Sequence, residues 1–127
     1  MEVLRFNRGP KVIGPYSSAV KSGNLIFFSG ILPMIPETGE MVTNDIAKAT
    51  KQILENLLVM LEQIGLSPRQ VVKTTIFTTK LDEFSKINEV YEEFFKSYTE
   101  NYPARSTVGV QSLPKNATVE MEFIVEC

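Results

Sequence analysis

The residues best suited to chemistry lie in two adjoining segments near the C-terminus, which the sequence predicts to be the strands of a hairpin. Successive side chains of a strand point to opposite faces of a sheet. We therefore expect Arg105 and Thr107 on the same face as Glu120 and Glu122. The other face is predicted to be apolar and to carry Val108, Val110, Val119, Met121, Phe123 and Val125. A face with a guanidinium, a hydroxyl and two carboxylates is either partly exposed to solvent or covered by another part of the protein, another subunit or a ligand.

Arg105 is the leading candidate for binding a ligand. Its planar guanidinium can hold a carboxylate through two parallel hydrogen bonds. Two kinds of partner fit the sequence: Glu120 or Glu122, in a salt bridge across the hairpin, or a small anionic ligand. A closed polar face favours the ligand, because a buried charge needs a partner.

The two glutamates are the candidates for proton transfer. The chain contains no histidine, so the usual Ser-His and Cys-His nucleophile pairs are excluded. A carboxylate in a partly desolvated cleft is then the only strong general base available. The alternatives for Glu120 and Glu122 are a solvated face or an ion pair between subunits. Thr107 either hydrogen-bonds a ligand or serves only as a β-branched strand residue.

Composition narrows the classes of function and partner. The 127 residues are enough for one domain, and 43% hydrophobic with 22% charged residues is ordinary for a globular protein. A net charge of −2 without a basic stretch disfavours nucleic acid as a partner. The single cysteine, Cys127, excludes an internal disulfide and leaves few ligands for a metal. No segment has the pattern of a signal peptide or the ~20 apolar residues of a membrane span, so a cytoplasmic location is expected.

The spacing of apolar residues predicts two helices. One runs from Ile46, with Asp45 among its capping candidates, to a stop at Gly65, and the other covers about Leu81–Tyr98. Alternation and turn signals predict the strands Val3–Phe6, Ser18–Ser22, Leu25–Ser29, Val71–Thr79, Arg105–Gln111 and Thr118–Glu126. The order β-β-β-α-β-α-β-β predicts an α+β domain in which both helices cover one face of a mixed sheet.

The segment Leu25–Phe28 is apolar on both faces of its strand. A strand with one wet face would alternate polar and apolar residues instead. Ile76 and Phe77 repeat this signal in a second strand. The simplest cover for the second face, in a chain of this size, is another copy of the chain. The sequence therefore predicts a homo-oligomer.

Seven separated blocks, in order between about Ile13 and Val125, resemble the RidA (YjgF) family of reactive-intermediate deaminases. These blocks are Ile13–Ser17, Phe28–Gly30, Thr38–Glu40, Val72–Phe77, Phe84–Tyr91, Tyr102–Ser106 and Leu113–Ala117. The resemblance implies a chorismate-mutase-like α+β subunit. It also implies a homotrimer whose sheets enclose a common inner core, with three clefts between subunits.

Carried over residue by residue, the resemblance implies a role for each candidate. Arg105 would hold the carboxylate of the ligand, with help from the backbone near Gly30 and Ile31. Glu120 would position the attacking water. The cleft would also be lined by Tyr16, Ser29 and Asn88. Thr107 stands where relatives often have cysteine, so a thiol function is excluded there and a hydroxyl hydrogen bond remains open.

The implied reaction is hydrolysis of short 2-imino or enamine acids, such as 2-iminobutanoate and 2-iminopropanoate, to 2-keto acids and ammonia. Such a substrate is already electrophilic, so the protein need only orient its carboxylate and deliver water. Neither a cofactor nor a metal is expected. The same residues would also suit a non-catalytic trimer that binds small carboxylates or another protein. Single-strand RNA cleavage, associated with some relatives, is disfavoured because histidine and basic stretches are absent.

Overall fold

The sheet has the strand order β1-β2-β3-β6-β4-β5 in the computed structural model, which describes residues 1–127. The strands are β1 (Glu2–Leu4), β2 (Ala19–Ser22), β3 (Leu25–Ile31), β4 (Val71–Thr78), β5 (Ala104–Gly109) and β6 (Val119–Glu126). Neighbouring strands are antiparallel, except that β4 and β5 are parallel. The sheet is therefore mixed, as the sequence predicts.

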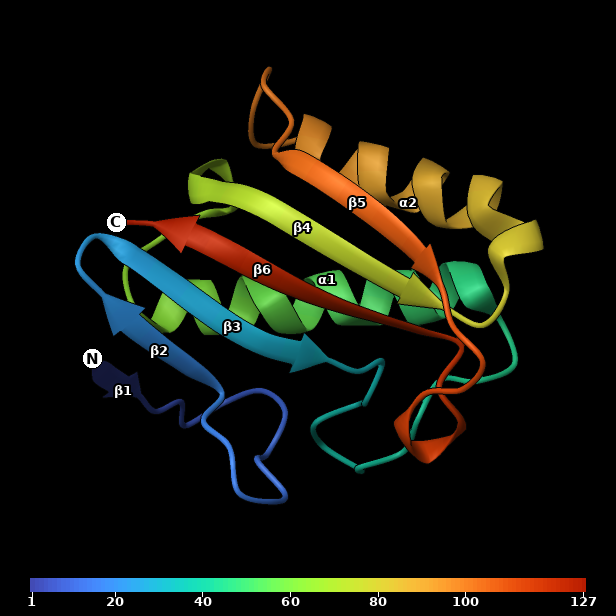
Figure 1. Cartoon of the computed structure of the whole chain (residues 1–127), viewed down its shortest axis with the longest axis horizontal. Helices are drawn as coiled ribbons and strands as arrows, with labels where there is room; N and C mark the ends of the chain where they lie inside the picture. Colours follow the sequence, from blue (N-terminus) through green and yellow to red (C-terminus); the bar gives the residue numbers. More distant parts are fainter.

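Both α-helices lie behind the same face of the sheet (Figure 1). Helix α1 (Ile46–Gln63) packs against β3 and β6, and α2 (Phe84–Lys96) lies beside α1, behind β5. Three short 3₁₀ turns, at Pro68–Gln70, Leu81–Glu83 and Pro114–Asn116, complete the helical structure. Neither α-helix combines the length and the hydropathy that crossing a membrane would require. No helix covers the front face of the sheet, which we call the open face.

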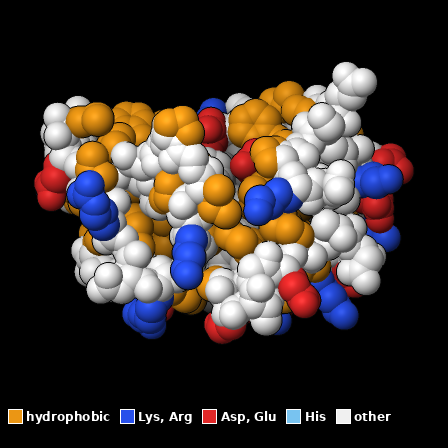
Figure 2. All heavy atoms as spheres, turned by 90° about the horizontal axis from the view of Figure 1, so that it is seen from below, with side chains coloured by type: hydrophobic (Ala, Val, Ile, Leu, Met, Phe, Trp, Pro, Cys, Tyr) orange, Lys and Arg blue, Asp and Glu red, His pale blue; other side chains and the backbone are white.

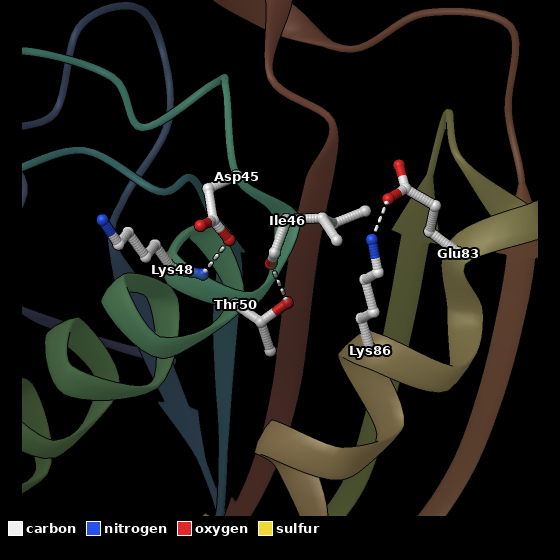
Figure 3. Close-up of polar contacts among 6 residues, drawn as sticks. All are labelled: Asp45, Ile46, Lys48, Thr50, Glu83 and Lys86. Atoms are coloured by element: carbon white, nitrogen blue, oxygen red, sulfur yellow. Dashed lines mark hydrogen bonds and ion pairs between the residues drawn. The ribbon is translucent and has the colours of Figure 1, made fainter.

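Polar side chains make contacts at the starts of the two helices (Figure 3). The Asp45 carboxylate accepts a hydrogen bond from the backbone N–H of Lys48 at 3.1 Å, which satisfies a donor that the first turn leaves free. Helix α2 follows a 3₁₀ turn and therefore starts at Phe84, three residues later than predicted. The Lys86 ammonium joins this turn to the helix through the Glu83 carboxylate at 2.9 Å.

The core lies between the helices and the back of the sheet. Alternate residues of β6 point into it and are almost completely buried. Those residues are Val119, Met121, Phe123 and Val125. They meet one face of α1, on which Ala49, Ile53 and Leu57 are fully buried. Removal of this apolar surface from water supplies the main stabilisation of the fold.

The last two strands do not form the predicted hairpin. β5 pairs in parallel with β4, whereas β6 lies on the other side of β4, between β4 and β3. The fully buried side of β6 requires a central position under α1. β5 has exposed or half-buried residues throughout, which suit the edge of the sheet. Residues 110–118 therefore connect two strands that are not neighbours.

Asn56 fixes the segment that follows β3 to helix α1. Its buried Nδ2 donates hydrogen bonds to the carbonyl oxygens of Met34, at 2.8 Å, and Leu32, at 3.4 Å. Its Oδ1 accepts a hydrogen bond from Gln52 at 3.0 Å. These contacts hold the chain just beyond Ile31, which is one of the predicted site residues.

We expect Asn56→Leu to lower the free energy of unfolding by about 1 to 3 kcal/mol, because buried carbonyl groups lose their donor while the branched arrangement of side-chain heavy atoms is kept. Chemical denaturation followed by circular dichroism measures the change. Gln52→Ala is the matched control and removes only a half-buried partner. A stability of Asn56→Leu equal to that of the parent would show that these hydrogen bonds do not hold the segment.

Candidate active site

Most of the predicted site residues lie in two separate places in the folded structure. We call the first the guanidinium cluster: Asn88, Tyr91, Glu92, Tyr102, Pro103 and Arg105, which line one cavity. We call the second the carboxylate cluster: Tyr16, Ser29, Gly30 and Ile31, which line another cavity, with Glu120, whose carboxylate lies against Gly30. Thr107 belongs to neither set.

Arg105 and Glu120 lie on opposite faces of the sheet. Arg105 is paired with Thr74 of β4, which is fully buried beneath the helices. Glu122 is paired with the next residue of β4, Thr75, and therefore points to the open face, as does Glu120. The predicted common face for arginine and glutamates is wrong, because it assumed direct pairing of β5 with β6.

The guanidinium of Arg105 is held against aromatic rings. Its central carbon lies 4.9 Å from the ring centroid of Tyr91 and 5.2 Å from that of Phe84. A cation at this distance over an aromatic face is attracted by the negative charge density of the ring. The one ion pair in the structure joins Lys86 to Glu83, so Arg105 has no carboxylate partner in its own chain. The salt bridge across a hairpin is therefore not formed.

The cavity beside Arg105 has a volume of about 380 Å³. Helix α2 supplies one wall through Asn88, Tyr91 and Glu92, and the segment that leads into β5 supplies the other through Tyr102 and Pro103. Asn88 and Arg105, two of the predicted site residues, both line this cavity. The cavity therefore offers a guanidinium and an amide to a small polar ligand.

Two aromatic residues that lie against Arg105 were not among the predicted site residues. Tyr91 and Phe84 fit the apolar spacing that predicts a helix over about Leu81–Tyr98, so that spacing did not indicate their contact with Arg105. Tyr91 is buried, and burial raises the pKa of its hydroxyl. The available signal was the spacing of Asn88, Tyr91 and Glu92, which places them on one face of a helix.

Glu120 lies in a partly buried position on the open face, directly over Gly30. A Cβ atom at Gly30 would be 2.6 Å from Oε2 of Glu120, so only glycine leaves room for the carboxylate there. Burial raises the pKa of the Glu120 carboxyl, and the charge of Glu122 raises it further. The folded state thus binds this proton more tightly than the unfolded chain, so stability falls as pH rises from the ordinary glutamate pKa through the raised one.

The cavity next to Gly30 is small, about 50 Å³, and its polar groups come from neighbouring loops and the end of β3. Ser29 is fixed in position because its hydroxyl donates a hydrogen bond to the carbonyl of Ser17 at 2.6 Å. Tyr16, which is 50% exposed, lines the same cavity. β3 continues through Ile31, two residues beyond its predicted end, with an irregularity between Phe28 and Ile31.

No group of three or more His, Cys, Asp or Glu side chains is arranged to hold a metal ion. The side chains of the two clusters have the following chemical capacities. The guanidinium can bind an anion, the hydroxyls and the amide can donate hydrogen bonds, and the carboxylate can accept a proton.

Comparison with known proteins identifies the family. The model of the endoribonuclease L-PSP family matches residues 6–127. A RutC family protein of Pyrococcus abyssi is 48% identical over 97% of this chain and 94% of its own length. The chain belongs to the RidA/YjgF/RutC family. Reactive Intermediate Deaminase A of Arabidopsis thaliana, a chloroplastic protein, is 42% identical over 97% of this chain and 64% of its own length.

Solved structures of the Rid family have the same fold. The crystal structure of Escherichia coli TdcF with bound serine superposes with a TM-score of 0.93 at 38% identity, covering 100% of this chain and 99% of that one. The α+β fold expected from the resemblance, with two helices on one face of a mixed sheet, is thereby confirmed.

We expect the Glu120 carboxyl to titrate above the ordinary glutamate range and its pKa to fall in Glu122→Gln, because that substitution removes the neighbouring negative charge. Side-chain carboxyl ¹³C NMR over a pH series measures the titration. Glu62→Gln, on the exposed side of α1, is the control and should leave it unchanged. An unaltered pKa in Glu122→Gln would show that Glu122 does not act on Glu120.

Proposed function

We propose that this Rid family protein hydrolyses short 2-imino acids, such as 2-iminobutanoate and 2-iminopropanoate, to 2-keto acids and ammonia. The observation that carries the proposal is the guanidinium of Arg105, which faces a cavity and has no carboxylate partner in its own chain. A 2-imino acid supplies the missing carboxylate. The names of relatives as reactive intermediate deaminases, and the serine bound to TdcF, support a small amino-acid-like ligand.

The proposed active form is a homotrimer in which the guanidinium cluster of one subunit meets the carboxylate cluster of the next. Phe27 and Val108 are exposed on the open face at 40% and 42%, and Ile13 is 63% exposed in the loop that carries Tyr16. Figure 2 shows the side of the molecule seen from below, not the open face, and hydrophobic side chains reach the surface there among scattered basic and acidic ones. Contact between copies would bury these apolar groups and bring Arg105 and Glu120 into one site.

In the proposed mechanism, Arg105 holds the substrate carboxylate through two hydrogen bonds, helped by the backbone near Gly30 and Ile31. Water attacks carbon C2 of the iminium group. As the new C–O bond forms, the π electrons of the C=N bond move to nitrogen, and Glu120 accepts a proton from the water. The raised pKa of Glu120 suits both the uptake and the return of this proton.

The resulting carbinolamine then collapses. Glu120 returns its proton to the amino group, and the C–N bond breaks with its electron pair going to nitrogen. The hydroxyl proton passes to the departing ammonia as the carbonyl of the 2-keto acid forms, so the nitrogen leaves as ammonium. Further hydrogen bonds to the substrate or the water are proposed from Tyr16, Ser29, Asn88 and Thr107. Thr107 is the residue of this set that follows Arg105 on the same face of β5.

A coupled assay separates this enzyme from a non-catalytic carboxylate-binding trimer of the same family. Catalytic amounts of the protein should speed the release of 2-ketobutyrate and ammonia from the imine that a threonine dehydratase produces. Binding of 2-ketobutyrate without acceleration would identify the non-catalytic alternative. A ribonuclease activity of this site would have to disappear in Arg105→Ala, and activity that persists in that variant is contamination.

Sedimentation equilibrium at micromolar concentration is expected to give three times the 14.3 kDa subunit mass. The exposed apolar residues of the open face provide the driving force. A stable monomer would contradict the proposal, because no chain could then combine Arg105 with Glu120.

Arg105→Ala should reduce kcat/KM by roughly 30-fold to several thousand-fold, because loss of a charge-assisted pair in a desolvated site costs about 2 to 5 kcal/mol. Arg105→Lys should recover little, since lysine keeps the charge but loses the planar fork. The coupled assay measures both variants, with Arg69→Ala, an exposed arginine on a surface turn, as the control. Parent-like kinetics in a folded Arg105→Ala trimer would assign Arg105 a structural role.

Glu120→Gln keeps the size and a hydrogen-bonding oxygen but removes the basic site. We expect kcat to fall about 100-fold or more, with little change in the affinity for a keto-acid product. Glu122→Gln should be mild and should move the acidic limb of the pH profile to lower pH, because the pKa of Glu120 falls. The reverse order of effects would transfer the role to Glu122, and full activity in both would leave no carboxylate of β6 in the reaction.

A further inference from the structure

The guanidinium of Arg105 needs contacts with other residues to keep one orientation. An arginine side chain has several rotatable bonds, and ordering it costs conformational entropy. In this chain no carboxylate holds it. The groups that lie against the guanidinium are the rings of Tyr91, at 4.9 Å, and Phe84, at 5.2 Å, both on α2.

The ring of Tyr91 is itself fixed at its far end. The Tyr91 hydroxyl donates a hydrogen bond of 2.9 Å to Oγ1 of Thr74, and both residues are buried. Thr74 lies on β4 at the position paired with Arg105 of β5. The ring of Phe95, fully buried, lies 4.7 Å from that of Tyr91. One hydrogen bond thus connects the strand beside Arg105 to the aromatic ring beneath its guanidinium.

We propose that Tyr91 and Thr74 are positioning residues that hold the guanidinium of Arg105 in the orientation that binds a carboxylate. An aromatic ring over the guanidinium occupies a face of the group and leaves the N–H donors at its edge for the ligand. The buried hydroxyl pair keeps the ring from turning or sliding. The kinetic consequence rests on the proposed function, whereas the ordering of Arg105 does not.

The first test measures that ordering directly. The Nε–H signal of Arg105, identified by its absence in Arg105→Lys, should show in the parent protein the ¹⁵N heteronuclear NOE of a rigid group and an upfield shift from the rings. Tyr91→Phe and Thr74→Val each remove the hydrogen bond with little change of volume, and the NOE should fall in both toward the value of exposed Arg69. Tyr98→Phe, a tyrosine of the following turn that lies outside the guanidinium cluster, should leave it unchanged. A mobile Arg105 in the parent, or an unaltered NOE in both variants, would overturn the proposal.

The second test measures the consequence for the ligand. Titration calorimetry with 2-ketobutyrate should show roughly threefold to tenfold weaker binding in Tyr91→Phe and in Thr74→Val, the change that corresponds to one neutral hydrogen bond. The double variant should be no weaker than either single one, because all three lack the same bond. In the coupled assay the effect should lie in KM with kcat nearly kept, since the carboxylate is held before and during reaction.

A fall in thermal stability without any change in affinity or NOE would show that the pair only packs the core, and would overturn the proposal. A parent protein that binds 2-ketobutyrate but does not accelerate imine hydrolysis would contradict the proposed function. In that case the positioning role is still decided by affinity and NOE.

Discussion

The position of β6 between β3 and β4 governs the rest of this structure. It buries one side of β6 under helix α1 and turns its other side, with Glu120 and Glu122, to the open face. β5 is thereby displaced to the edge, where Arg105 points back toward α2. A guanidinium and a carboxylate of one small domain are thus kept apart by the sheet itself. Neither can neutralise the other, so each remains available to a ligand or a second chain.

The guanidinium of Arg105 and the carboxylate of Glu120 are held by different kinds of contact. The guanidinium rests on aromatic rings, one of which is tied to β4 through Thr74. The carboxylate of Glu120 occupies space that only a glycine at position 30 leaves open, and burial raises its pKa. Both arrangements carry a free-energy cost, since a charge loses part of its hydration. Under the proposed function, a substrate carboxylate and a water molecule would interact with these two groups.

Local patterns in the sequence were sufficient to predict both α-helices and the approximate positions of most strands. The apolar spacing behind Asp45 predicts α1 to within a few residues, because capping and periodicity are both local signals. The strand order depends on contacts between distant segments and is not a local property. The short connection after Gln111 suggested that β5 and β6 form a hairpin. The full burial of one side of β6 explains why β4 lies between them. The contact of Tyr91 with Arg105 could not be predicted for a similar reason. An aromatic residue that packs against a guanidinium has the same helical spacing as an aromatic residue that packs in an apolar core.

Complementation between two inactive variants tests most directly whether the site is shared between chains. Arg105→Ala and Glu120→Gln subunits, unfolded together and refolded as mixed trimers, would form sites that combine an intact Arg105 with an intact Glu120 from neighbouring chains. Random assembly of equal amounts predicts about one quarter of the parent activity. Each site needs an intact Arg105 from one subunit and an intact Glu120 from the next, and each of these has an even chance of being present. The same variants refolded separately and then mixed are the control. If mass spectrometry confirms mixed trimers and the activity stays at the level of the separate variants, the site does not lie between subunits and the account is wrong.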